Sequence, residues 1–296
     1  MARLAKTSTS LAWPRARARH AAGRLSLVGA LLILAVIFIF PLLWMLSTSF
    51  KVPGDELVWP PQWLPDPATF DNYVELFSSS TARYFPFATF IFNSFYIAVV
   101  VVIGRLIVCG AGGYAFARMN FPGRDLAFGM LLAALLLPDV VLIIPLYVFY
   151  QRIGWLDTHL PLLVSPIFAN TFGTFLFRQY FMTLPSELED AARMDGANHY
   201  QIFWYVAAPM ATAVAAALAI FTFEGSWNNF TTPVIYITTI RKQTLPVGLQ
   251  AFNQQFDTQY SILMAGAIVA LVPVMLVFVA FQRYFVQGIQ LTGLKG

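Results

Sequence analysis

The sequence predicts an all-α integral membrane protein with six transmembrane helices and a cytoplasmic helix between the fourth and the fifth. Of its 296 residues, 58% are hydrophobic and only 11% are charged, whereas ordinary globular domains carry about a quarter charged residues. The apolar residues gather in segments of the length that crosses a bilayer as a helix, about 20 residues. These segments show no strand-like alternation, and helices pair all backbone groups internally in lipid.

The first apolar segment follows a basic tail. Residues 1–24 carry six Lys and Arg residues and no acid, and they have no apolar face, which predicts a disordered cytoplasmic tail. The run from Leu25 to Ser47 is too long for a signal peptide and is expected to remain as a signal-anchor helix. Residues 25–296 are then expected to form one six-helix domain.

A proline-rich loop at 51–85 follows, with tryptophans typical of a membrane boundary and a short helix expected over Thr69 to Phe77. The remaining predicted spans are Ala88–Ala115, Leu126–Tyr150, Leu160–Phe177, Pro209–Phe223 and Ile262–Phe281.

The basic residues predict the orientation of these spans. If both termini are cytoplasmic, the inner segments carry twelve Lys and Arg residues and the outer loops carry five, with Arg105 inside a span. Cytoplasmic flanks are normally the more basic. The termini and the loop between the fourth and fifth spans are therefore expected to be cytoplasmic.

That loop, residues 186–208, is the most polar long stretch between two spans. Ser186 and Glu189 have the spacing of a capping box at a helix start. Gly196 predicts a stop or bend, because it accepts a left-handed backbone. A second amphipathic turn is expected from Asn198, and Pro209 then enters the next span.

The loop resembles the EAA loop of ABC importer permeases. The family pattern is Glu-Ala-Ala, three residues, Gly, nine residues and Ile-x-Leu-Pro; here it reads Asp190-Ala191-Ala192, Gly196 and Val206-Ala207-Ala208-Pro209. The departures are Asp for Glu, Val for Ile and Ala for Leu. Asp keeps the acid with a shorter reach.

The wider resemblance is to carbohydrate-uptake permeases, the group of the smaller permease of maltose importers. It is carried by stretches such as Phe221 to Phe230 (FTFEGSWNNF) and Thr244 to Leu249 (TLPVGL), and by the tail Gly293 to Gly296, which looks like an ATPase-contacting end. It implies a permease subunit, not an enzyme, in a bacterial cytoplasmic membrane. The subunit would form half of a translocation path for a sugar or sugar-like solute.

The implied partners are a second homologous permease, two ATPase subunits and an extracytoplasmic solute-binding protein. ATP and Mg would bind to the ATPases, and this chain itself has no P-loop pattern. The residues expected to couple it to the ATPase are Glu189, Asp190, Ala191, Ala192, Asp195 and Gly196.

Polar residues in or near the spans are candidates for the translocation path: Asn93, Asp139, Asn170 and Asn228. The alternative for the asparagines is hydrogen bonding between helices. Asp139 follows Pro138 and is either a cavity group or a structural carboxyl. Arg105 is expected either to pair with Asp139 or to extend to the membrane boundary.

A rival function is a self-contained secondary transporter that uses Asp139 as a proton carrier, but no convincing inverted repeat supports it. The three histidines, His20, His159 and His199, fall in separate segments, so no metal site is expected.

Overall fold

The computed structural model describes residues 12–56, 58–255 and 259–293, and within these residues the regular structure is entirely helical. Four helical stretches are long and apolar enough to cross a membrane: 23–48, 87–118, 160–183 and 260–282. Two bent helix pairs bring the number of candidate spans to six if each pair is one span. The predicted all-helical membrane fold is therefore confirmed, with two of the expected spans broken.

Both breaks lie where the sequence places proline. The third expected span consists of α5 (Arg124–Ala134) and α6 (Asp139–Arg152), which meet at 100°. Pro138 precedes α6, and the residue before a proline is disfavoured in a helix. In the fifth, residues 199–210 meet α12 (Thr212–Trp227) at 78°. Pro209 lies just before this break, within α11 (Ala208–Met210).

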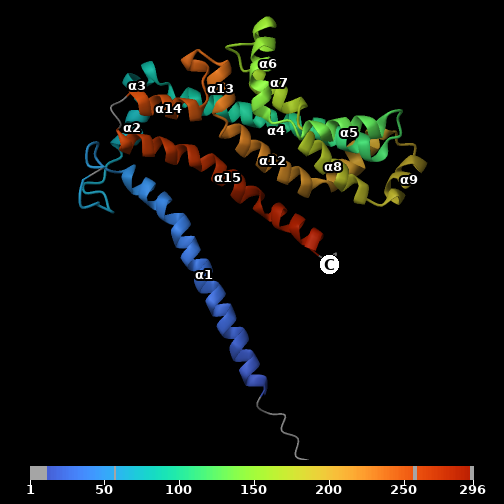
Figure 1. Ribbon diagram of the computed structural model, residues 1–296, viewed down its shortest axis with the longest axis horizontal. Coiled ribbons are helices and arrows are strands. Elements are labelled where there is room, and N and C mark those ends of the chain that lie inside the picture. The colour runs from blue at the N-terminus through green and yellow to red at the C-terminus, as the bar shows by residue number, and fades with distance from the viewer. Residues whose placement is uncertain (1–11, 57, 256–258, 294–296) are drawn as a thin grey trace, which may run out of the picture.

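Helix α4 (Phe87–Arg118) is the centre of the bundle (Figure 1) and packs against α7 (Leu160–Phe168), α8 (Thr171–Thr183) and α12. The approach of α4 to α8 requires a residue without a side chain. A Cβ added at Gly113 would lie 2.8 Å from the backbone nitrogen of Arg178. A side chain at position 113 would therefore clash with the backbone of α8. Small residues let membrane helices approach each other this closely.

The remaining elements cap the two ends of this bundle. One end carries α2 (Asp71–Leu76), α3 (Ser79–Tyr84) and α14 (Leu245–Gln255). α2 confirms the short helix expected in the proline-rich loop. α13 (Thr231–Tyr236) and a 3₁₀ turn (Ile240–Lys242) follow α12. α9 (Ser186–Met194) lies at the opposite end (Figure 1).

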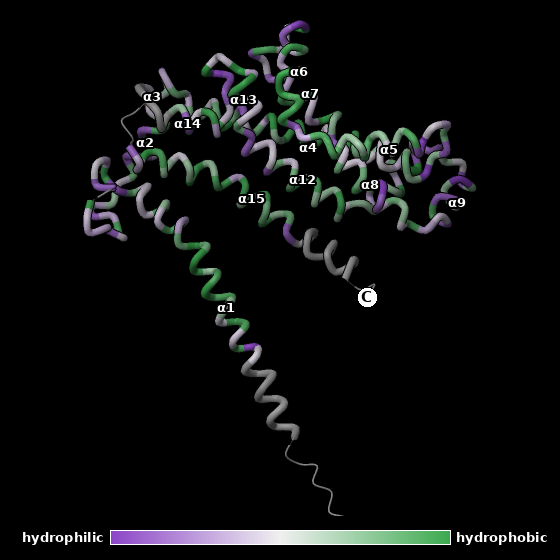
Figure 2. The backbone as a smooth tube through the Cα atoms, viewed as in Figure 1, coloured by the Kyte–Doolittle hydropathy of each residue, from purple (hydrophilic) through white to green (hydrophobic). Residues whose placement is uncertain are grey.

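Helices α1 (Ala12–Thr48) and α15 (Tyr260–Gly293) complete the chain. α1 starts within the basic segment rather than after it, so residues 12–24 are helical and not an irregular tail. It contacts α15 and then diverges from the bundle (Figure 1). Over residues 23–48, most large apolar side chains of α1 are exposed, and Figure 2 shows the hydrophobic stretch of this helix in green.

Candidate functional site

Helix α9 is a short, firmly terminated helix. Gly196 has φ +84°, and its N–H donates to the carbonyl of Arg193 at 2.9 Å while that of Ala197 donates to Ala192 at 3.0 Å. This pair of bonds is the Schellman motif, which satisfies the last carbonyls of a helix. The predicted stop at Gly196 is confirmed.

The predicted capping box at Ser186 and Glu189 is wrong. Pro185 occupies the N-cap position of α9 and no side chain caps it. The capping box instead starts α10 (His199–Ile202), where Asn198 and Gln201 exchange two bonds of 2.9 Å. Glu189 is drawn away from the cap because a buried cation lies on its other side.

That cation is Arg118, the last residue of α4. Its Nε lies 3.2 Å from Glu189 Oε1, and the two side chains are 15% and 9% exposed. The same guanidinium donates to the carbonyls of Phe181, at 3.0 Å, and Leu184. Arg193 lies 3.8 Å from the other carboxylate oxygen. Arg118 thus joins α9 to both α4 and the end of α8.

The two alanines of the motif have different surroundings. Ala191 is exposed, as are Asp190 and Asp195, whereas Ala192 is half-buried against the aromatic cluster at this end of the bundle. The two alanines therefore do not lie together on one exposed docking face. The exposed face instead includes Met194, which is 88% exposed; sequence reasoning passed over it.

The chain after α10 enters the aromatic cluster directly. Ile202 is fully buried and Phe203 is 7% exposed, and Phe203 begins a π-helical turn (Phe203–Ala207). Its ring packs against those of Tyr114 and Phe181. A displacement of α9 and α10 must therefore move side chains of α4 and α8, because close-packed interiors transmit strain.

The four predicted path residues do not share a cavity. Asn93, 5% exposed, donates to the carbonyls of Arg241 at 3.0 Å and Gln243 at 2.9 Å. The Asn170 side chain caps α8 by accepting from Gly173. Asn93 thus joins two distant segments, which was the alternative, whereas the Asn170 contact is a local helix cap. Asn228 is exposed, with its amide 3.4 Å from Glu224, and Asp139 is exposed at the first residue of α6.

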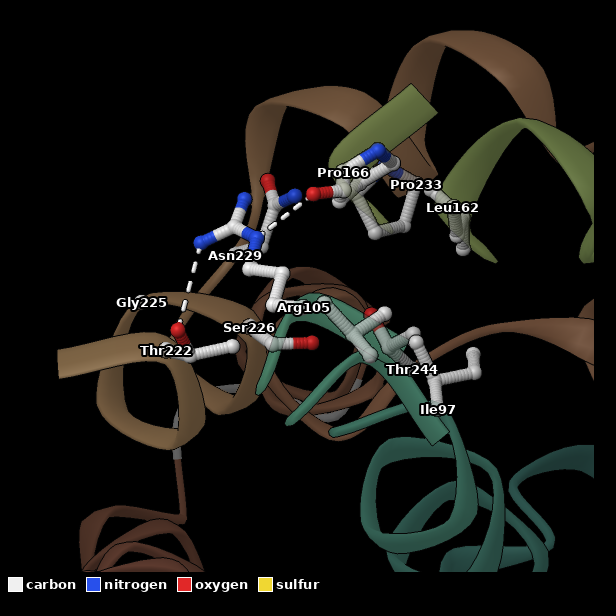
Figure 3. Close-up of a pocket in the computed structure, with 11 residues that line it drawn as sticks. Ile97, Arg105, Leu162, Pro166, Thr222, Gly225, Ser226, Asn229, Pro233 and Thr244 are labelled. Atoms are coloured by element: carbon white, nitrogen blue, oxygen red, sulfur yellow. Dashed lines mark hydrogen bonds between the residues drawn. The ribbon is translucent and has the colours of Figure 1, made fainter. Parts of the chain in front are cut away.

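Arg105 is the charged group that faces a cavity. It makes no ion pair with Asp139 or with any other described carboxylate, so that predicted pair is wrong. The Arg105 Nε donates to the carbonyl of Pro166 at 2.5 Å, and Nη1 lies 3.4 Å from the Thr222 hydroxyl. Figure 3 shows the guanidinium between these two groups.

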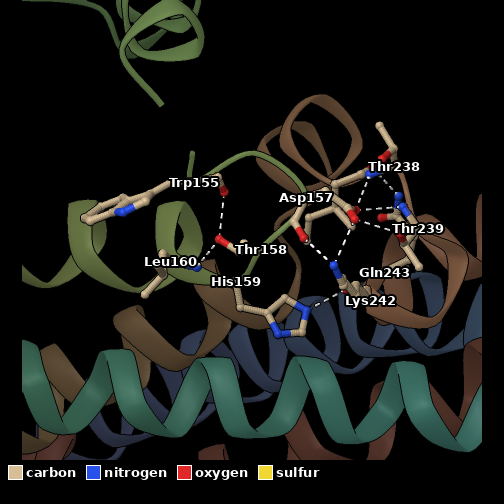
Figure 4. Close-up of polar contacts among 10 residues, drawn as sticks. Trp155, Asp157, Thr158, His159, Leu160, Thr238, Thr239, Lys242 and Gln243 are labelled. Atoms are coloured by element: carbon tan, nitrogen blue, oxygen red, sulfur yellow. Dashed lines mark hydrogen bonds and ion pairs between the residues drawn. The ribbon is translucent and has the colours of Figure 1, made fainter. Parts of the chain in front are cut away.

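A polar cluster fastens two loops at one end of the bundle (Figure 4). Asp157, at φ 55°, accepts hydrogen bonds from the N–H groups of Thr238 and Thr239 at 3.0 and 2.8 Å. It also pairs with Lys242 at 2.8 Å. The Lys242 ammonium and these donors hold the pKa of Asp157 well below its ordinary value. The cluster ties the α6–α7 connection to the segment after α13.

His159, next to this cluster, contacts the Tyr96 hydroxyl through Nδ1 and the Lys242 carbonyl through Nε2. Both ring nitrogens are thus taken by structural contacts. Within the described residues, no group of three or more His, Cys, Asp or Glu residues is arranged to hold a metal ion.

The comparison with known families identifies the chain. The family described as "Binding-protein-dependent transport system inner membrane component" matches residues 107–291, which include α9 and the bend at Gly196. The chain belongs to this family. It is therefore the membrane component of an ATP-driven importer, a transport subunit and not an enzyme, and ATP binds to separate ATPase subunits.

Curated relatives cover nearly the whole permease. The arabinooligosaccharides transport system permease protein AraQ of Halalkalibacterium halodurans is 35% identical over 270 residues, which are 89% of this chain and 93% of AraQ. The diacetylchitobiose uptake system permease protein NgcG of Streptomyces coelicolor is 38% identical over 86% of this chain and 83% of NgcG.

Among solved structures, a chain of a bacterial ABC transporter for the acidic polysaccharide alginate superimposes with a TM-score of 0.80. It covers 91% of this chain and 98% of the other at 24% identity, which establishes a shared fold. The permease is a multi-pass inner-membrane protein that works with an extracytoplasmic binding protein.

Proposed function

We propose that this permease forms half of the translocation path for a sugar or sugar-like solute and is driven by an ATPase that binds α9. The cargo class is supported by the relatives, whose printed names include arabinooligosaccharides, diacetylchitobiose and galactooligosaccharides. The other half of the path is a second, homologous permease. Two ATPase subunits and a solute-binding protein complete the assembly, with both termini and α9 in the cytoplasm.

The observation that carries the coupling role is the construction of α9. A coupling element must transmit force, so it should be stiff, terminated at both ends and fixed to the transmembrane helices. The Schellman motif at Gly196 stiffens one end, and the Arg118–Glu189 contact fixes the helix to α4. The exposed side offers Asp190, Ala191 and Met194 to a partner. Asp190 suits an arginine or backbone N–H donor.

The exposed apolar surface of α1 supports a second membrane subunit. Within its described side chains, most large apolar residues are exposed, and the helix leaves the bundle rather than packing along it. Lipid covers part of such a surface, and a neighbouring helix covers the rest. The basic residues 1–24 favour a cytoplasmic start. The ATPase contact expected of the tail falls mostly outside the described residues, at 294–296.

Two experiments test the proposal. Purification of the tagged full chain from its native membrane should bring an ATPase, a second six-span permease and the binding protein in stoichiometric amounts. In proteoliposomes, the assembled complex should transport solute only when ATP is present on the side of the membrane that carries the ATPase subunits. An imposed proton gradient should not replace ATP. Uptake by this chain alone, driven by a proton gradient, would restore the secondary-transporter hypothesis built on Asp139.

A further inference from the structure

The cavity at Arg105 lies between four helical segments in the middle of the fold. It has a volume of about 170 Å³, well above the roughly 10–15 Å³ that one water needs. Its walls come from α4, α7, α12 and the segment from Asn229 to Thr244. Arg105 is about 4 Å from the midpoint of α4, counted at the helical rise per residue, so the cavity lies beside the middle of this helix.

The guanidinium in this cavity lacks a counter-charge. Arginine remains protonated in proteins and carries five N–H donors. Within the described chain, its two hydrogen-bonding contacts are with the Pro166 carbonyl and the Thr222 hydroxyl, and no carboxylate lies within ion-pair distance. A charge removed from water is costly unless it is paired.

Apart from Arg105, the lining combines apolar residues with polar side chains that carry no charge. Hydroxyl and amide side chains come from Thr222, Ser226, Asn229 and Thr244. Thr244 is only 3% exposed, and its hydroxyl has no hydrogen-bond partner among the described residues. A buried hydroxyl without a partner and a guanidinium without a counter-charge line the same cavity, which indicates that a polar ligand completes both. Figure 3 shows these groups arranged around one space.

We propose that this cavity receives an anionic group carried by the solute, a carboxylate, phosphate or sulfonate on a sugar, with Arg105 as the anion-binding residue. The inference rests on the proposed function and narrows its substrate class to acidic sugars. The neutral side chains then take sugar hydroxyls, as in other sites that combine a few polar groups with one charge. The contact with Pro166 orients the guanidinium and leaves its remaining donors for the ligand.

The test measures the electrostatic preference of the cavity without knowledge of the solute. In the assembled complex in phosphatidylcholine nanodiscs, Cys109 is replaced by Ala and Ser226 by Cys. The new thiol reacts with an anionic and a cationic methanethiosulfonate reagent of matched size. Each rate is divided by the rate of the same reagent at a control Cys in place of exposed Ser79, which does not line the cavity.

The proposal expects the normalised anionic rate to exceed the cationic rate by about tenfold or more, as a nearby unpaired charge should produce. Arg105→Gln should reduce the ratio to about one, and Arg105→Lys should retain most of it. A ratio near one in the parent protein overturns the proposal even if Arg105→Gln fails to assemble. So does a ratio that Arg105→Gln leaves unchanged.

A lipid headgroup offers the same anionic chemistry, so a second arm separates the two sources. Nanodiscs containing phosphatidylglycerol should give the same labelling rates as phosphatidylcholine if the site is reached from the solute path. Blocking of the anionic reagent by the anionic lipid would overturn the solute assignment. In both arms, ATP hydrolysis stimulated by the binding protein is measured separately and reports on coupling to the ATPase. A failure of the proposed transport function is thereby distinguished from a failure of the anion-site proposal.

Discussion

Arg118 Nε, at the end of α4, lies 3.2 Å from Glu189 Oε1 in α9, and this contact joins the helix of the EAA-like loop to the central transmembrane helix. Glu189 immediately precedes the acidic residue that matches the family motif. The chain therefore has two adjacent acids with opposite directions: Glu189 points into the permease and Asp190 is exposed.

Loss of the inward acid should destabilise the permease. Glu189→Ala leaves Arg118 buried without its carboxylate, which costs about 3 kcal/mol for a buried pair. Glu187→Ala, an exposed acid two residues earlier, should change stability by less than about 0.5 kcal/mol. Thermal unfolding of the two purified variants measures the difference. Equal melting temperatures would show that the Arg118 contact has no structural weight.

Loss of the exposed acid, Asp190, should leave stability unchanged and weaken binding of the ATPase. Asp190→Asn keeps the shape of the side chain and removes its charge, so the melting temperature should stay within error of the parent. Affinity for the ATPase should fall about tenfold, the equivalent of one charge-assisted hydrogen bond. Titration of the ATPase onto the permease pair in nanodiscs measures it. An unchanged affinity combined with lower stability would contradict the assigned directions.

The two alanines should also differ. Ala191→Arg places a bulky cation on the exposed face and should abolish transport while leaving the permease folded in the membrane. Ala192→Arg should abolish transport as well, but here α9 is also forced away from the aromatic cluster, so the melting temperature falls. Uptake assays paired with thermal unfolding separate the two. Wild-type uptake in Ala191→Arg would remove this face from the proposed ATPase contact.

The bend at Gly196 should tolerate few residues. At φ +84° a side chain costs about 1–2 kcal/mol, and the space around the glycine is open, so the cost of Gly196→Ala is in the backbone alone. Gly196→Asn should cost less, because Asn tolerates this conformation. Gly196→Pro cannot adopt it and should abolish transport with the subunit still in the membrane. Solute uptake should therefore decrease from the Gly196→Asn variant to Gly196→Ala and be absent in Gly196→Pro, and an uptake assay of the three variants measures this order.

The cluster at Asp157 should make stability depend on acid pH. Because folding lowers the pKa of this carboxyl, its contribution is fully present above the unfolded pKa of about 4 and is lost as pH falls below that value. The difference in melting temperature between the parent and Asp157→Asn should therefore be constant from about pH 8 to pH 6 and shrink below about pH 4. A difference that grows towards acid pH would contradict this sign.

Sequence patterns predicted what depends on local chemistry. The spans followed from apolar length, and the stop at Gly196 followed from its backbone freedom. The bend between α5 and α6 falls inside Leu126–Tyr150, which was predicted as one span. Its angle depends on packing that no local pattern encodes.

The errors concern long-range partners. Ser186 and Glu189 have capping-box spacing, but Arg118, more than sixty residues earlier in the chain, competes for the carboxylate. Asn93 and Asn170 looked like solute ligands, yet each satisfies a backbone group at a helix break or loop. A pair between Arg105 and Asp139 was one of two alternatives for Arg105, but the 100° bend places Asp139 at an exposed helix start.

Site-specific cross-linking from α9 tests the central claim most directly. In the assembled complex, with Cys109 replaced, Met194→Cys labelled with benzophenone maleimide should form a photo-cross-link with an ATPase subunit, at a yield that changes when ATP closes the ATPase dimer. Leu64→Cys, equally exposed at 81% but in the proline-rich loop, should give none. If Met194→Cys reacts only with lipid or water-soluble reagents and never with the ATPase, α9 is not the coupling element.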